Sequence, residues 1–79
     1  SLAEQRRLIN VCQASLQRAK NGERIEDMNQ LLAQIDKGIS AAEQLDEETR
    51  EILEDESINA LGQEQSNEET LLSLEEEFL

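Results

Sequence analysis

The sequence lacks most of the residues that hold small proteins together by covalent bonds or metal ions. Its 79 residues contain no histidine, proline, tryptophan or tyrosine, and Cys12 is the single cysteine. One cysteine excludes an internal disulfide, and the absence of histidine removes the common zinc ligand sets. We therefore expect no metal site and no cofactor. A lone thiol also favours a reducing intracellular compartment, the cytoplasm.

The shortage of reactive side chains argues against catalysis. Cys12 could act as a nucleophile only beside a base, and the chain has no histidine to serve as one. Carboxylates can transfer protons when burial or a like charge raises the pKa of one of them. Here the acids cluster where apolar residues are few. We predict that the chain is not an enzyme and has no catalytic residue.

Basic residues are scarce in the second half of the chain. Residues 1–45 carry six acidic and six basic side chains, whereas residues 46–79 carry thirteen acids and only Arg50 as a base. The net charge of −12 therefore comes entirely from the second half. Because phosphate binding needs a basic surface, we expect no nucleic-acid partner. No apolar run approaches the roughly 18 residues of a membrane-spanning helix, so we expect no transmembrane segment.

What the sequence does contain favours helix. It has 12 leucines and 6 isoleucines in a chain rich in glutamate and glutamine. A first apolar stripe at steps of three and four residues predicts a helix over residues 2–20, with Ser1 at capping distance from Glu4. Asn21 and Gly22 favour the left-handed backbone that ends helices. The stripe consists of Leu2, Ile9, Cys12, Leu16 and Ala19, with the polar Gln5 in the slot between Leu2 and Ile9.

A second stripe follows a heptad pattern, and it predicts a helix over residues 23–55. The first 20 residues carry a net charge of +3 and residues 21–45 one of −3, so the two helices can pair as an antiparallel hairpin. Gly38 would let a neighbouring backbone approach closely. The stripe offers a seam for a partner helix, made by Ile25, Met28, Leu32, Ile35 and Ile39.

The C-terminal residues predict a separate acidic helix. Residues 62–67, GQEQSN, read as a polar linker, and Ser66 with Glu69 has capping-box spacing before an apolar run. A helix over residues 67–79 would place leucines and the only aromatic residue along one side. We predict that Leu71, Leu72, Leu74 and Phe78 bind a partner.

These patterns predict an all-α fold: a helical hairpin or small three-helix bundle with coiled-coil-like packing and an acidic C-terminal helix. The expected division is a hairpin over residues 1–56, a linker over 57–66 and the acidic helix over 67–79. Alternatively, the C-terminal leucines fold back as a third helix, and their acids then meet the basic first segment.

The stretch LLSLE, residues 71–75, resembles the clathrin box, a short peptide of the form leucine, bulky apolar, any residue, bulky apolar, acid. This resemblance implies that Leu71, Leu72 and Leu74 dock into a groove on the terminal domain of clathrin. The chain would then be a fragment of a trafficking adaptor.

The function we expect is non-catalytic adaptor or assembly work, in which apolar stripes bind partner helices. The expected partner is a protein that offers a helix or an apolar groove with a basic rim. A homo-oligomer is an alternative, because a chain of this length buries only a modest core. A different alternative is a regulatory or inhibitory segment that covers a basic surface.

Overall fold

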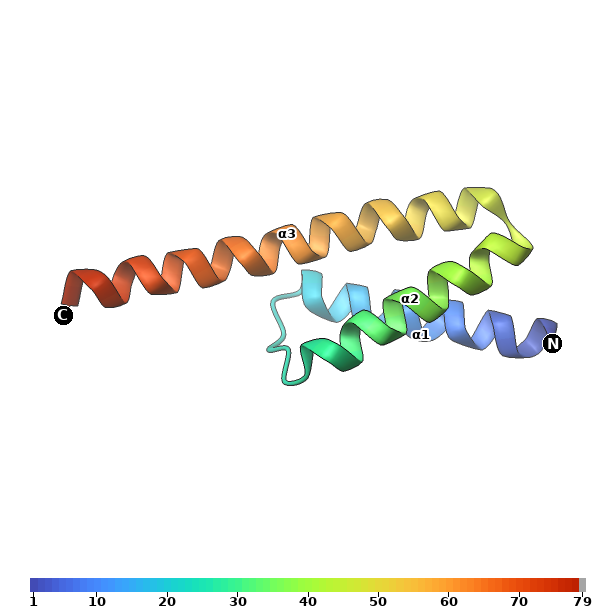
Figure 1. The fold of residues 1–79 in the computed structure, drawn as a ribbon, viewed down its shortest axis with the longest axis horizontal. Coiled ribbons are helices and arrows are strands. Elements are labelled where there is room, and N and C mark those ends of the chain that lie inside the picture. The colour runs from blue at the N-terminus through green and yellow to red at the C-terminus, as the bar shows by residue number, and fades with distance from the viewer. Residues whose placement is uncertain (79) are drawn as a thin grey trace.

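Three helices account for the described part of the chain. The computed structural model describes the backbone of residues 1–78 and the side chains of residues 1–62 and 70–77. Over this range the helices are α1 (Leu2–Lys20), α2 (Met28–Leu45) and α3 (Glu47–Phe78). They pack against one another, and the described residues form no strand (Figure 1). The predicted all-α helical bundle is confirmed.

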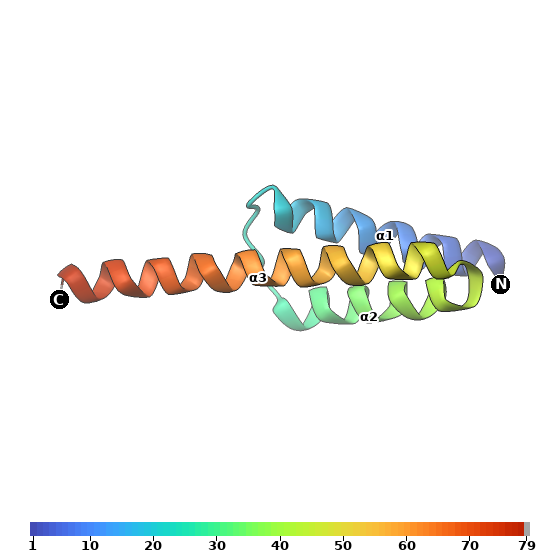
Figure 2. The ribbon, with the colours of Figure 1, turned by 90° about the horizontal axis from the view of Figure 1, so that it is seen from above.

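The unequal lengths of the helices set the shape of the molecule. At 1.5 Å per residue, α1 and α2 are each about 28 Å long, whereas α3 is about 48 Å long. The hairpin of α1 and α2 therefore covers only the first part of α3, and the rest projects beyond it (Figures 1 and 2). The molecule measures 54 × 21 × 17 Å along its principal axes. We call residues 62–78 the α3 extension.

The first helix begins and ends as its sequence predicts. The Ser1 hydroxyl accepts a hydrogen bond from the backbone N–H of Glu4 at 3.2 Å. At the other end, Gly22 adopts a φ of +82°, which glycine reaches without steric cost. The Glu23 N–H donates to the Arg18 carbonyl at 3.1 Å, and the Gly22 N–H donates to Ala19. This is the Schellman arrangement, and it turns the chain away from α1.

The prediction of one helix over residues 23–55 is wrong, because α2 begins later and ends earlier than that range. Residues 21–27 form the connection, and α2 begins only at Met28, where the Asp27 carboxylate caps the Gln30 N–H at 3.1 Å. Asp27 followed three residues later by Gln30 is a capping-box spacing that could have been read from the sequence. The helix then breaks at Asp46, whose backbone is extended.

Asp46 both ends α2 and starts α3. Its N–H donates to the Ala42 carbonyl at 2.8 Å, as the last bond of α2. Its carboxylate accepts from the Glu48 N–H at 3.2 Å and from the Thr49 hydroxyl at 2.7 Å. One residue therefore satisfies groups at two helix ends, and the chain reverses direction over a single position.

The backbone also differs from the expected linker over residues 57–66. It is helical throughout α3, including the stretch expected to separate the last two segments. The third helix of the bundle is consequently the first part of α3, not the C-terminal leucines. Whether the chain behaves as separate domains stays a prediction.

The core lies between the hairpin and the first part of α3. Leu16 and Leu53 are the largest fully buried side chains, and they come from α1 and α3. Five partly buried apolar residues from α1, the connection and α2 pack around this core. The buried apolar cluster consists of Cys12, Leu16, Leu31, Ile35, Ala42, Leu53 and Ala60.

Gly38 makes the contact between α1 and α2 close. A Cβ atom at this position would lie 2.3 Å from the Cβ of Cys12, 2.9 Å from its Sγ and 3.2 Å from the Leu8 carbonyl oxygen. Real Cβ atoms do not approach a neighbour at the first of these distances. The expectation that Gly38 permits close backbone approach is confirmed, and the neighbour is α1.

We predict that Gly38→Ala lowers the free energy of unfolding by about 1–3 kcal/mol, because the added methyl forces α1 and α2 apart. Urea denaturation would measure this loss. Cys12→Ala should not rescue the variant, since the nearest atom is the Cβ that alanine keeps. Gly62→Ala is the matched control: nothing lies within 4 Å of its Cβ, so a comparable loss there would contradict the packing argument.

Removing the cap at Asp46 should destabilise the reversal between α2 and α3. We expect Asp46→Ala to cost about 1 kcal/mol, because the Glu48 N–H loses its acceptor. Asp46→Asn keeps a side-chain oxygen and should retain most of the stability. Equal losses in both variants, measured by thermal unfolding, would show that charge rather than capping matters.

Candidate partner-binding surface

The predicted heptad seam lies mostly inside the molecule. Ile35 is buried, and Ile25, Met28 and Ile39 are partly buried against the core. Only Leu32 is exposed, at 43%. The inner face of α2 is rotated toward Leu31, Ile35, Gly38 and Ala42, which are all buried.

This rotation has a physical cause. α2 packs against both α1 and α3. Gly38, which lies beside the predicted seam and not within it, is the position where α1 approaches α2 closely. The buried face is therefore wider than one seam. Partner binding by these residues stays a prediction, but their apolar surface is largely occupied within the chain.

The predicted C-terminal anchors lie outside the bundle. Leu71, Leu72 and Leu74 are 61%, 60% and 47% exposed, and every side chain described from residue 70 to 77 is exposed. The side chain of Phe78 lies outside the described residues. The helical segment that carries these three exposed leucines projects beyond the bundle (Figure 2).

Charge is distributed unevenly along α3. Its single base, Arg50, contacts Glu47, Glu51 and Glu54 on neighbouring turns, and the Glu54 distance is 2.7 Å. Hydrogen bonds to Glu47 and then Glu54 raise the pKa of Arg50, and the bond from Arg50 lowers the pKa of Glu47. This base therefore balances acids at the start of α3. Residues 62–79 contain six acids and no base.

Three of the four basic residues of α1 pair with acids outside the C-terminal segment. Arg7 pairs with Glu4 at 2.6 Å and Arg18 with Glu23 at 3.1 Å. Lys20 lies 3.7 Å from Glu56, in the part of α3 that belongs to the bundle. The α3 extension points away from α1, so the alternative in which the C-terminal leucines fold back over the hairpin is not the observed arrangement (Figure 1).

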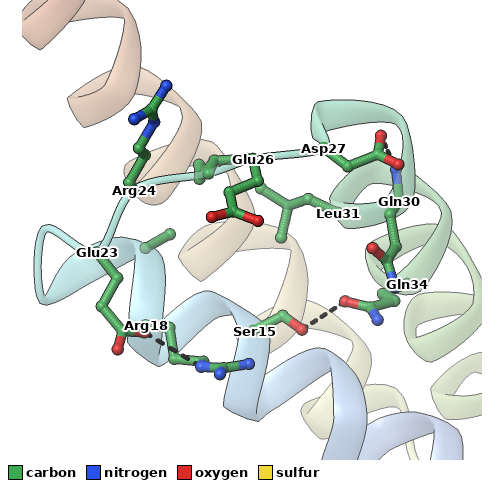
Figure 3. A pocket seen from close by; sticks show the side chains of 11 residues that line it. Ser15, Arg18, Glu23, Arg24, Glu26, Asp27, Gln30, Leu31 and Gln34 are labelled. Carbon is green, nitrogen blue, oxygen red and sulfur yellow. Dashed lines mark hydrogen bonds and ion pairs between the residues drawn. The ribbon is translucent and has the colours of Figure 1, made fainter.

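A cleft of about 570 Å³ lies where the connection between α1 and α2 folds over the end of the hairpin. Four of its polar side chains bond in pairs: Ser15 donates to Gln34 at 2.6 Å, and Arg18 pairs with Glu23 at 3.1 Å (Figure 3). The Asp27 carboxylate is engaged as the α2 cap. The cleft is thus explained by the way the connection is held, and the α3 extension is the stronger candidate surface.

Cys12 is fully buried, and its Sγ lies 3.9 Å from the Ile35 carbonyl oxygen. Burial, and secondarily the charge of Glu56, raise the pKa of this thiol to about 11. The thiol is therefore a packing group in this structure. Among the described residues, no cluster of three or more acids and cysteine is arranged to hold a metal ion. Over the same residues, no helix is both long and apolar enough to cross a bilayer.

No protein-family model matches this chain, and no curated protein or solved structure matches it either.

The raised pKa of Cys12 predicts a loss of stability at alkaline pH. Below pH 9 the thiol is protonated in both states, and between about pH 9 and 11 only the unfolded chain releases the proton. We expect the free energy of unfolding to fall by up to about 2–3 kcal/mol across this window. Cys12→Ala, which cannot titrate, is the control. An identical pH dependence in both proteins would contradict the assignment.

Proposed function

We propose that this chain is a non-catalytic protein–protein interaction module of the adaptor or assembly type, and that the α3 extension is its binding element. The observation that carries this proposal is the exposure of Leu71, Leu72 and Leu74 on a helix that leaves the bundle. Adjacent exposed leucines beyond a covered core are typical of recognition surfaces.

The bundle supports this role by fixing one end of the extension. Leu53 and Ala60 are buried against the hairpin, so the first part of α3 is held while the rest projects. Helices in proteins owe most of their stability to tertiary packing, which α3 makes only along its first part. Anchoring it to a folded bundle lowers the conformational entropy lost on binding, which strengthens the complex.

The acidic half of the chain favours a second candidate, a regulatory segment that covers a basic surface. This candidate rests on six acids without a base in residues 62–79. It predicts binding that weakens steeply with added salt, because exposed charges are screened beyond about 10 Å at 0.1 M ionic strength. Binding through the leucines predicts weak salt dependence.

The clathrin-box interpretation requires Leu71, Leu72 and Leu74 to enter one groove together. In α3 these residues are helical, and consecutive positions point about 100° apart around the helix axis. Docking in that manner would therefore require the extension to unwind. Titration of the chain with the clathrin terminal domain tests this alternative directly.

Quantitative capture from cell extract tests the proposed function. We expect the double variant Leu71→Ser, Leu74→Ser to capture at least about tenfold less of each specific partner than the unmodified chain does. Ile58→Ser is the matched control, since Ile58 is 70% exposed but lies in the part of α3 beside the hairpin. Partners retained by the double variant, or lost equally by the control, would refute the extension as the binding element.

A further inference from the structure

The stripe of α3 that faces the core continues into the α3 extension. Leu53, Ser57 and Ala60 are buried against the hairpin at steps of four and three residues. The same alternation continues through positions 64, 67, 71, 74 and 78. A straight helix drifts by about 20° per heptad, so over three heptads these positions stay on one side of the helix. We call these eight positions the inner stripe.

The composition of the inner stripe changes where the hairpin ends. Positions 64 and 67 hold glutamate and asparagine, and positions 71, 74 and 78 return to leucine, leucine and phenylalanine. Leu71 and Leu74 are exposed although they occupy the register that is buried beside the hairpin. Leu72 is equally exposed, but it lies about 100° away from Leu71 and outside the inner stripe.

A second copy of this chain is a poor occupant for this surface. Pairing two extensions would bring together twelve acids and no base, six from each residue 62–79 segment. Like charges at neighbouring helical positions are destabilising. A partner that carries lysine or arginine beside its apolar residues removes this penalty and adds attraction.

The spacing of the apolar positions in the inner stripe indicates which secondary structure the partner segment has. Apolar positions at alternating steps of three and four fit a helix that lies lengthwise along α3, as the hairpin helices do on its first part. We propose, building on the function above, that a basic amphipathic helix of another protein packs along the inner stripe of the extension. This partner helix would cover the inner stripe of the extension as α1 and α2 cover the first part of α3.

A charge-reversed peptide provides a defined probe. It carries the sequence of residues 62–79 with lysine at each glutamate, which keeps the apolar register and inverts the charge. Titrated into the full chain, it should bind with a dissociation constant of about 10 μM and raise helix content in far-UV circular dichroism. The unaltered acidic peptide is the matched control and should not bind. The six replaced residues are Glu64, Glu68, Glu69, Glu75, Glu76 and Glu77.

Two single variants test the register. Leu71→Ser should weaken peptide binding about tenfold, whereas Leu72→Ser should change it by less than about threefold. Equal losses would overturn the inner stripe as the contact. If the unmodified chain lost all binding of the lysine peptide at high salt, the contact would be purely electrostatic. That result would also overturn the proposal.

The remaining outcomes are equally decisive. Failure of the lysine peptide to bind at about 1 mM would overturn the basic-helix partner. A dimer of the unmodified chain at neutral pH that Leu71→Ser dissociates would assign the surface to a second copy instead. Capture that depends on the leucines while the peptide fails would leave the proposed function standing and refute this inference alone.

Discussion

The close contact between Cys12 and Gly38 sets the arrangement of the bundle. The absent side chain at Gly38 lets α1 lie against α2 at a distance that any Cβ would forbid. With the hairpin fixed in this way, Leu16, Leu31 and Ile35 form a surface that Leu53 of α3 completes. The same contact buries the Cys12 thiol, which raises its pKa and removes it from solution chemistry.

The unpartnered surface follows from the dimensions of that hairpin. Because α1 and α2 end after about five turns, they leave roughly 20 Å or more of α3 without a neighbour. Leu71, Leu72 and Leu74 beyond this point face solvent, and residues 62–79 carry six acids and no base. The proposed basic partner rests on this combination of a projecting apolar stripe and charges of one sign.

Local signals in the sequence were reliable where they act over three or four residues. Two features required no knowledge of the fold: the Ser1 cap and the end of α1 near Asn21 and Gly22. Asp27 and Asp46 carried equally local signals, but the heptad pattern that spans Asp27, and the apolar face that resumes at Ile52 and Leu53, favoured one long helix. The backbone stays helical through the stretch expected as a linker, because glycine disfavours a helix without obliging a break and the glutamines and glutamate that follow Gly62 are good helix formers.

The amino-acid pattern alone settled that the chain is helical, where α1 lies, and which residues are apolar enough to form adhesive stripes. Periodicity states that a side chain belongs to a stripe, but it does not state whether a neighbour covers that stripe. That decision came from packing: the hairpin covers Ile35 and Leu53 and ends before Leu71 and Leu74, although Leu53, Leu71 and Leu74 share one register on α3. Burial depends on the relative lengths and directions of three helices, and those are properties of the assembled bundle rather than of any one segment.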